Sequence, residues 1–244
     1  MRQPRIYVED SLAPGGVLQL APEPARHLTQ VLRLQQDAPL VLFNGDGHDY
    51  RARIIHIERS AVRVRILAAG EPEPRHPLAI TLSLGVSKGE RMDVALQKAV
   101  ELGVARISPL FTERSQVRLS GARLERRQNH WRGVLIAACE QSGRRRVPRL
   151  DPAAPFRDWL EGQGEGGWLL DPTASQPLAS AAPPDARITL LVGPEGGLSP
   201  REREQARAAG LTGVHLGPRI LRTETAPLAA IAIIQALWGD LRGN

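Results

Sequence analysis

The sequence predicts an α/β protein of two domains, a small N-terminal β-barrel followed by a domain with a mostly parallel sheet. Three observations lead to this fold. About the first 70 residues contain short segments of strand composition, a proline-rich stretch follows, and strand and helix patterns then alternate to the end of the 244-residue chain. A chain of this length can form one large domain or two modest ones.

The N-terminal segments are typical of short strands and turns. Apolar and β-branched residues dominate 17–20, 40–43, 50–57 and 61–67, and the last segment alternates apolar residues with arginine. Such alternation predicts a half-buried strand. A short helix is expected at 24–32. Four or five strands and one helix in this length indicate a small barrel.

The stretch from Glu71 to Pro77 contains three prolines. Proline fixes φ and removes a backbone donor, so this stretch predicts a stiff, extended linker between the two domains.

After the linker the pattern changes to alternating strands and helices, which predicts a mostly parallel sheet covered on both faces. Ser199 is expected to cap a helix that has Pro200 at its first position and Glu202 at its third. The expected strands are 78–86, 104–110, 167–170, 187–192 and 214–216, and the helices are 90–102, 124–141 and 199 to about 209.

The last expected helix, from about Pro227 to Trp238, has almost no polar face. A helix that is apolar all round is buried. Because a C-terminal helix is usually peripheral, we expect this one to be buried in a homodimer.

Composition and charge limit the function classes. No apolar run approaches the roughly 20 residues of a membrane span, and the N-terminus lacks a signal-peptide core. The single cysteine and the spacing of the six histidines give no disulfide, no zinc site and no other metal site. We therefore expect a cytoplasmic protein without a membrane partner. The net charge of +6 favours RNA or DNA as partner, unless it reflects an arginine-rich proteome.

Two glycine-rich turns each follow a short apolar run. Gly193-Pro194-Glu195-Gly196-Gly197 comes after 190–192, and Gly217-Pro218 comes after 214–216. Glycine lets a backbone approach a ligand closely. The spacing matches neither the dinucleotide fingerprint nor the P-loop, and Glu195 is unsuited to a phosphate cradle. The turns predict a site for a nucleotide-type cofactor with an adenosine and a positive centre.

Longer motifs resemble one enzyme family over the whole chain. They are Arg2–Val8, Lys88–Asp93, Gln97–Val104, Thr112–Ser115, Ala138–Arg144 with Pro148, Gly193–Gly197, Leu216–Gly217 and Ile220–Ala226. In these motifs the chain resembles the 16S ribosomal RNA uridine-N3 methyltransferases. It departs from them at Cys139, where the family usually has alanine, and this side chain is expected only to pack.

The resemblance implies a PUA-like, RNA-binding β-barrel over 1–72 and a SPOUT α/β methyltransferase domain over 73–244. A deep trefoil knot in the second domain would hold S-adenosyl-L-methionine, near the interface of a homodimer. The substrate would be one uridine of 16S rRNA in the small ribosomal subunit, methylated at N3. The strand pattern by itself gives no indication of a knot.

The resemblance also implies which residues bind the cofactor. They are Leu191, Gly193, Glu195, Gly196, Leu216, Gly217, Ile220, Leu221 and Ala226. For the leucines the alternative is core packing, and for the glycines it is turn formation alone.

Methylation at N3 requires loss of a proton from uridine, which a base or a cation near the uridine oxygens would assist. Glu224 or Glu195 could act as the base and Arg222 as the cation. A structural Arg–Glu pair is the alternative, and the sequence does not assign the base.

RNA contacts are expected from three places: the N-terminus, the helix 90–102 with its entry, and the end of the helix 124–141. The residues are Arg2, Arg5, Lys88, Arg91, Lys98, Gln141, Arg144 and Arg146. The alternatives are solvated, salt-bridged faces and compensation of the charge at a helix C-terminus.

Two other functions remain open at this point. A SPOUT ribose 2′-O-methyltransferase would share the knot but not the motifs at 88–104 and 140–144. A non-catalytic RNA-binding ribosome assembly factor would not need the glycine-rich turns that are expected to hold a cofactor. The intact turns at 193–197 and 216–226 argue against this function.

Overall fold

The structure is a computed structural model that describes residues 3–58, 61–74, 77–162, 166–182 and 185–242. The chain divides into two compact units. The first comprises Met1–Pro74 together with Cys139–Val147, and the second comprises Arg75–Ala138 and Pro148–Asn244. The segment 139–147 thus packs with the N-terminal part of the chain, which the linear domain pattern did not predict.

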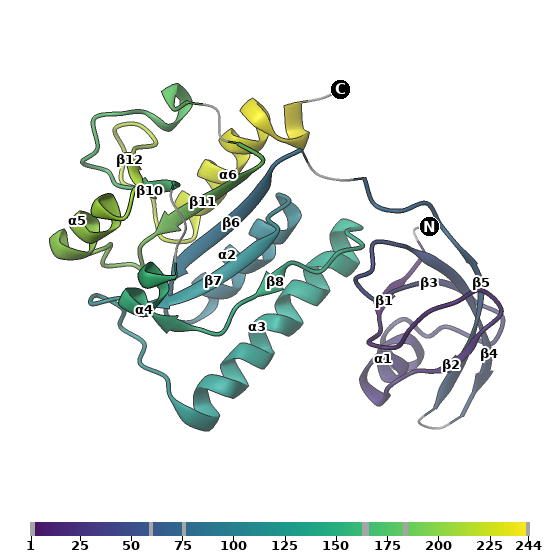
Figure 1. Cartoon of the computed structure of the whole chain (residues 1–244). Helices are drawn as coiled ribbons and strands as arrows, with labels where there is room; N and C mark the ends of the chain where they lie inside the picture. The colour runs from purple at the N-terminus through teal and green to yellow at the C-terminus, as the bar shows by residue number, and fades with distance from the viewer. Residues whose placement is uncertain (1–2, 59–60, 75–76, 163–165, 183–184, 243–244) are drawn as a thin grey trace. The chain divides into compact units, whose positions relative to one another are not determined.

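The first unit is built on a mixed sheet (Figure 1). Its buried apolar side chains form one core. Its strands are β1 (Arg5–Tyr7), β2 (Val17–Gln19), β3 (Pro39–Phe43), β4 (Tyr50–Ile57) and β5 (Val62–Ala69), in the order β1-β3-β4-β5-β2. The pair β1–β3 is parallel and the other pairs are antiparallel. In the described residues the pairing runs from β1 to β2 as an open path, where the sequence predicted a barrel.

The core of this unit comes from the alternation predicted for β4 and β5. Ala52, Ile54, Val64 and Ile66 point inward and are almost fully buried, while the residues between them are exposed. The helix expected at 24–32 is α1 (Pro22–Arg26) continued by the π-helical turn η1 (His27–Val31).

The second unit contains a parallel sheet, as the alternating pattern predicted. Its order is β12-β10-β11-β6-β7-β8, with β9 also paired to β7. The strands are β6 (Ala79–Gly85), β7 (Arg106–Phe111), β8 (Arg149–Leu150), β9 (Ala154–Pro155), β10 (Trp168–Leu170), β11 (Arg187–Val192) and β12 (Thr212–Val214). Strands buried on both faces read as apolar runs, which explains the composition of β6 and β11.

Helices cover both faces of this sheet. The helices α4 (Phe156–Glu161) and α5 (Pro200–Ala208) pack against the side chains of β7, β10 and β11 that point to one side. The helices α2 (Glu90–Glu101) and α6 (Thr225–Trp238) contact each other and lie on the other side (Figure 1). The long helix α3 (Gly121–Ser142) begins in this unit and ends in the first.

The remaining elements are the short 3₁₀ turns η2 (Leu178–Ser180) and η3 (Asp240–Arg242). None of the helices in the described ranges has the length and hydrophobicity that crossing a bilayer requires.

The terminal helix α6 is only partly buried in the single chain, and its expected burial in a homodimer stays a prediction. Ala230, Ile231 and Ile234 are fully buried, but Leu237 is 37% exposed. The amide of the buried Gln235 donates to the carbonyl oxygen of Leu102, 2.9 Å away, and fixes α6 to the end of α2.

Candidate active site

A cavity of about 620 Å³ opens at the carboxyl ends of β10, β11 and β12. The segments that follow these strands line it, at 170–172, 192–198 and 214–226 except Pro218 and Thr225, and three arginines from elsewhere complete the wall: Arg91, Arg114 and Arg203. Ligands of α/β proteins bind beyond the carboxyl ends of the strands, and this volume lies in the usual range for small-molecule sites.

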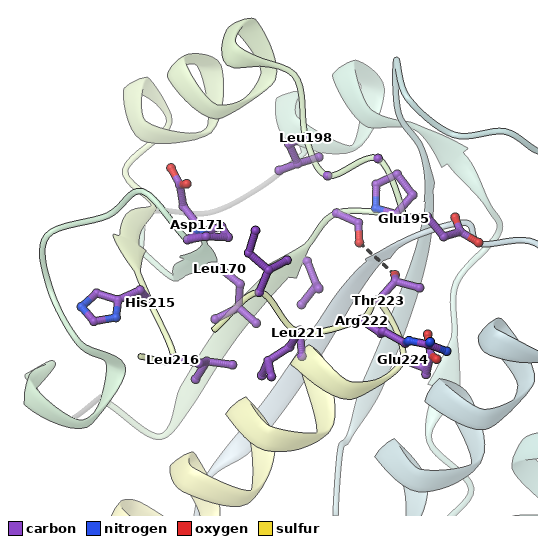
Figure 2. A pocket seen from close by; sticks show the side chains of 18 of the residues that line it. Leu170, Asp171, Glu195, Leu198, His215, Leu216, Leu221, Arg222, Thr223 and Glu224 are labelled. Atoms are coloured by element: carbon purple, nitrogen blue, oxygen red, sulfur yellow. Dashed lines mark hydrogen bonds between the residues drawn. The ribbon is translucent and has the colours of Figure 1, made fainter. Parts of the chain in front are cut away.

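The cavity combines an apolar wall with charged ends. Leucines from the segments after the three strands line it, whereas Glu195, Arg222 and Glu224 lie at one end and Asp171 and His215 lie at the other (Figure 2). No group of three or more His, Cys, Asp or Glu side chains that could hold a metal ion occurs in the ranges that the structure describes.

The glycines of the two turns have conformational reasons for being there. A Cβ on Gly193 would come within 2.7 Å of the backbone nitrogen of Leu198, so no larger residue lets this turn close. Gly217 has φ +99°, a conformation that other residues rarely adopt. Turn formation, the alternative raised from the sequence, therefore applies to both positions, and both also line the cavity.

The first turn is anchored to two neighbouring segments by polar contacts. The Thr223 hydroxyl donates to the carbonyl oxygen of Gly193 at 3.2 Å and also lies 3.1 Å from the Ser87 hydroxyl (Figure 2). Arg114 Nη1 donates to the carbonyl oxygen of Gly196 at 3.0 Å. These contacts fix the geometry of the turn, as the positioning of a reactive group requires.

Glu195 connects the same turn to the start of α2. Its Oε1 accepts hydrogen bonds from the backbone N–H of Lys88 at 2.9 Å and from Arg91 Nη1 at 3.2 Å. Burial alone would raise the pKa of Glu195, but the hydrogen bonds from the backbone of Lys88 and of Glu195 itself and from Arg91 outweigh it and lower the pKa below 4.5. An ionised, engaged carboxylate is poorly suited to accept a proton at neutral pH.

Glu224 and Arg222 have no such contacts. In the described part of the chain, Glu224 Oε2 is buried without a hydrogen-bond partner. The Arg222 side chain is exposed, and neither a hydrogen bond nor an ion pair joins it to another described residue. The structural Arg222–Glu224 pair raised as an alternative is therefore not formed.

Asp171 lies at the opposite end of the cavity and is fully engaged. Its buried carboxylate accepts from the Thr173 backbone at 2.9 Å and from the Thr173 hydroxyl at 2.7 Å, and Arg203 and Arg207 pair with it. Burial would raise the pKa of Asp171, but these hydrogen bonds and charges lower it below 3.8. We conclude that Asp171 fixes the loop after β10.

Most residues expected to bind the cofactor or to act in catalysis line this one cavity. They are Gly193, Glu195, Gly196, Leu216, Gly217, Ile220, Leu221, Arg222, Glu224 and Ala226. Leu191 does not, because its side chain is fully buried against Leu110 and Leu169, as the core-packing alternative held. Ile220 is 87% exposed at the rim.

The residues expected to contact RNA are dispersed in the second unit. Arg91 lines the cavity, the Lys88 side chain is exposed, and Lys98 pairs with Glu101 at 2.8 Å. The last contact matches the alternative of a salt-bridged helix face.

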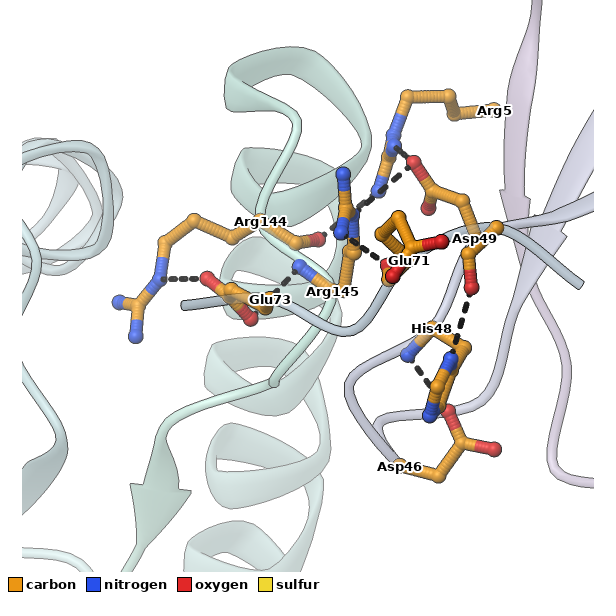
Figure 3. Close-up of polar contacts among 9 residues, drawn as sticks. Arg5, Asp46, His48, Asp49, Glu71, Glu73, Arg144 and Arg145 are labelled. Atoms are coloured by element: carbon orange, nitrogen blue, oxygen red, sulfur yellow. Dashed lines mark hydrogen bonds and ion pairs between the residues drawn. The ribbon is translucent and has the colours of Figure 1, made fainter. Parts of the chain in front are cut away.

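In the first unit, two of the expected RNA-contacting arginines belong to an internal polar network (Figure 3). The Arg5 side chain is 8% exposed, pairs with Asp49 and lies over the ring of Phe43 at 4.9 Å. The Arg144 side chain is 10% exposed and lies 3.9 Å from Glu73. These contacts support structural roles for both.

Gln141 and Arg146 are exposed, and Arg2 lies outside the described residues.

Sequence reasoning missed several residues of the cavity wall: Leu170, Asp171, Pro172, Arg114, Leu198, Arg203, His215 and Thr223. The sequence contains one signal that could have identified part of this wall, namely that the expected strand 167–170 ends directly before the polar residue Asp171. A polar residue directly after a parallel strand lies at the edge of the sheet where ligands bind, and Asp171 holds that position.

Comparison with known proteins gives a consistent result. The model of an RNA methyltransferase domain matches residues 74–235, and that of an RNA methyltransferase PUA domain matches 21–67. A ribosomal RNA small subunit methyltransferase E from Buchnera aphidicola is 32% identical, covering 98% of each chain. The protein of the same name from Bacillus subtilis is 27% identical, covering 91% of each.

Two solved structures are similar to the whole chain. A methyltransferase from Legionella pneumophila in complex with its bound cofactor SAM is 38% identical, with a TM-score of 0.95 over 98% of this chain and 100% of its own. A ribosomal RNA small subunit methyltransferase E from Neisseria gonorrhoeae bound to S-adenosyl methionine is 41% identical, with a TM-score of 0.94 over the same shares.

Proposed function

Since this chain belongs to the RNA methyltransferase family with an N-terminal PUA domain, we propose that it methylates 16S rRNA of the small ribosomal subunit at N3 of one uridine. S-adenosyl-L-methionine supplies the methyl group as an electrophile. The single observation that carries the proposal is the preorganised cavity at the ends of β10, β11 and β12, in a fold that two cofactor-bound methyltransferases share.

The cavity has the properties that this cofactor requires. Its leucines offer an apolar wall for an adenine ring, and the backbone of the two turns offers N–H and C=O groups for polar contacts. We assign cofactor binding to the nine residues expected from the sequence except Leu191, whose burial in the core gives it a supporting role.

We propose that Arg222 stabilises the negative charge that develops on the uridine ring when the N3 proton leaves. Its guanidinium is exposed at the cavity and not neutralised by a described carboxylate. We assign the base to Glu224 rather than to Glu195. Each carboxylate has a buried Oε2 without a described partner, but hydrogen bonds from Lys88 and Arg91 to Oε1 hold Glu195 ionised, whereas no described group donates to the Glu224 side chain.

Arginines outnumber acids in the cavity wall, five to three, which favours a polyanionic substrate. The five are Arg91, Arg114, Arg203, Arg219 and Arg222, and the three are Asp171, Glu195 and Glu224. With Lys88, Arg91 is our proposed RNA contact at this entrance. Gln141 and Arg146, both exposed, are the proposed contacts in the first unit.

We also propose the SPOUT fold with its trefoil knot, the division into 1–72 and 73–244, a homodimer, and action in the cytoplasm. The family matches at 21–67 and 74–235 support the division. The half-exposed apolar side of α6 supports the dimer, which sedimentation at several concentrations tests.

The function is tested by incubating the purified protein with S-adenosylmethionine and small ribosomal subunits that lack the modification. Mass spectrometry of the digested nucleosides is expected to detect N3-methyluridine. Arg222→Ala and Glu224→Gln should each lower the rate by about 10²–10⁴-fold. The exposed Arg201, outside the cavity, provides the control Arg201→Ala.

Other outcomes select other functions. Methylation of a ribose oxygen would identify a 2′-O-methyltransferase. Cofactor binding without any methylated nucleoside would refute the substrate, and absence of cofactor binding would leave an RNA-binding assembly factor.

A further inference from the structure

The outer face of the first unit's sheet carries four arginines on two neighbouring strands. Arg51 and Arg53 belong to β4, Arg63 and Arg65 belong to β5, and all four are exposed. Each alternates with buried residues, so all four project from the same face of the sheet. We call this set the arginine face.

Strand register brings these charges together. Arg53 lies directly opposite Arg65, and Arg63 lies opposite His56. Strand β2 continues the same face on the other side of β5, where Val17 pairs with Arg65 (Figure 1). Like charges directly opposite each other destabilise a sheet. The pairing of Arg53 with Arg65 is therefore an unfavourable arrangement for the free protein.

No described carboxylate forms an ion pair with any residue of the arginine face. Arg53 Nη1 donates to the backbone carbonyl oxygen of Asp37 at 3.0 Å, and this neutral acceptor leaves the positive charge uncompensated. Glu58, at the end of β4, pairs instead with His56 at 2.6 Å.

Some exposed arginines of the second unit have carboxylate partners: Arg157 pairs with Glu161, and both Arg106 and Arg149 pair with Asp151. Others, such as Arg201 and Arg222, have no described ion pair, so one unpaired arginine alone indicates no partner. The arginine face differs because four unpaired charges share one face of the sheet and two of them lie directly opposite each other. Such a concentration of positive charge favours a polyanionic partner.

We propose that the arginine face binds the phosphate backbone of RNA as a second contact, in a different unit from the cavity. The inference rests on the proposed function only in taking RNA as the polyanion. The planar guanidinium suits phosphate oxygens. Backbone contacts fix position without reading sequence, so the face contributes to affinity and not to the choice of uridine.

The test replaces Arg51, Arg53, Arg63 and Arg65 together by glutamine. The control replaces four exposed arginines of the second unit that do not line the cavity and so removes the same charge: Arg157, Arg187, Arg201 and Arg242. Binding of protein-free 16S rRNA is measured by filter retention from low to high potassium chloride, and methylation rates are measured at varied RNA concentration.

The arginine-face variant should bind RNA about tenfold or more weakly at low salt. Its slope of log K against log salt should become shallower by about 0.7–0.9 for each phosphate group that the variant no longer neutralises. KM for RNA should rise while kcat stays unchanged, and the control should behave like the wild type. Thermal unfolding at low salt should move to higher temperature, because the opposed charges are gone.

Three results would overturn the inference: unchanged affinity and slope in a folded variant, an equal loss in the control, or a wild type that uses the face for phosphatidylserine vesicles and not for RNA. A wild type that binds RNA through this face without methylating it would refute the proposed function and leave this inference standing. If the wild type methylates RNA and the arginine-face variant binds RNA with unchanged affinity and KM, this inference is refuted and the proposed function stands.

Discussion

At the scale of single residues, Glu195 and Glu224 differ in their contacts although both line one cavity. Both have a buried Oε2 without a described partner, but Glu195 Oε1 accepts two hydrogen bonds that tie the first turn to α2, whereas no described group donates to the Glu224 side chain. The same residue type can therefore serve as an anchor at one position and as a base at the other, because its surroundings differ.

Substitutions at Glu195 separate these roles. Glutamine keeps an oxygen that can accept from the Lys88 N–H, and alanine keeps none. If Glu195 is an anchor, we expect Glu195→Ala to weaken cofactor binding more than Glu195→Gln, with kcat of the glutamine variant reduced less than about 10²-fold. Isothermal titration and steady-state rates measure both effects. A loss of about 10²–10⁴-fold in kcat for Glu195→Gln alone would instead identify Glu195 as the base.

The single cysteine allows a chemical prediction. The Cys139 side chain is fully buried, and this burial raises the pKa of its thiol to about 11. Since the thiolate is the nucleophile, the native protein should react with iodoacetamide at pH 8 far more slowly than the urea-unfolded protein. Mass spectrometry follows the alkylation, and equal rates in the two states would contradict the packing role of this side chain.

At the scale of elements, the capping box of α5 is the most complete agreement between sequence and structure. Ser199 Oγ accepts from the Glu202 backbone N–H, and the Glu202 side chain accepts from the Ser199 backbone N–H. A local motif fixes this helix start, so the sequence alone predicts it. Glu202 also accepts from the Glu113 N–H at 2.8 Å, a long-range contact that no local pattern reveals.

This contact makes two substitutions unequal. Ser199→Ala should lower the free energy of unfolding by about 1 kcal/mol, the usual loss for an N-cap. Glu202→Ala should lower it by more, because it leaves the N–H group of the buried Ser199 without its acceptor, at about 1–3 kcal/mol, and also removes the bond from the N–H of the exposed Glu113. Urea denaturation measures both, with Arg201→Ala as an exposed control in the same turn. Equal losses would argue against the bond to Glu113.

The elements that sequence reasoning missed are short. Strands β1, β8 and β9 and helix α4 have two to six residues each, too few for a periodicity to develop. The expected strand 214–216 is β12 at Thr212–Val214, because its position is set by pairing with β10, while His215 only bridges to Pro177. The long, regular elements α2, β6 and β11 were predicted within two residues at each end.

At the scale of the whole molecule, the pKa values of the buried Asp171 and the half-buried Glu140 are shifted in opposite directions. Hydrogen bonds and arginines lower the pKa of Asp171 despite its burial, whereas burial raises the pKa of Glu140 above 4.5 despite its bond from the Tyr7 N–H. As the pH falls, the carboxyl of Asp171 takes up a proton in the unfolded chain, near pH 3.8, before it does so in the folded protein. The stability from Asp171 is therefore present above that pH and is lost as pH falls through the folded pKa.

For Glu140 the sign is reversed, because the folded protein holds the proton more tightly. Its contribution is present below pH 4.5 and is lost as pH rises through the folded pKa. We expect Asp171→Asn to reduce the loss of stability on acidification and Glu140→Gln to reduce the loss on raising the pH above 4.5. Thermal unfolding from pH 3 to pH 7 tests both, and identical pH profiles for wild type and variants would contradict the assignments.

The parallel sheet of the second unit has a consequence for synthesis. Strand β6 leaves the ribosome early, yet β11, which pairs with it along six positions, follows only after residue 186. At about 5–20 residues per second, β6 waits roughly 5–20 seconds for this neighbour with an apolar edge unpaired. The cavity wall extends to Ala226, so the pocket cannot be complete before that residue has been added. A nascent chain of this protein therefore exposes this edge of β6 until residues 187–192 have emerged from the ribosome.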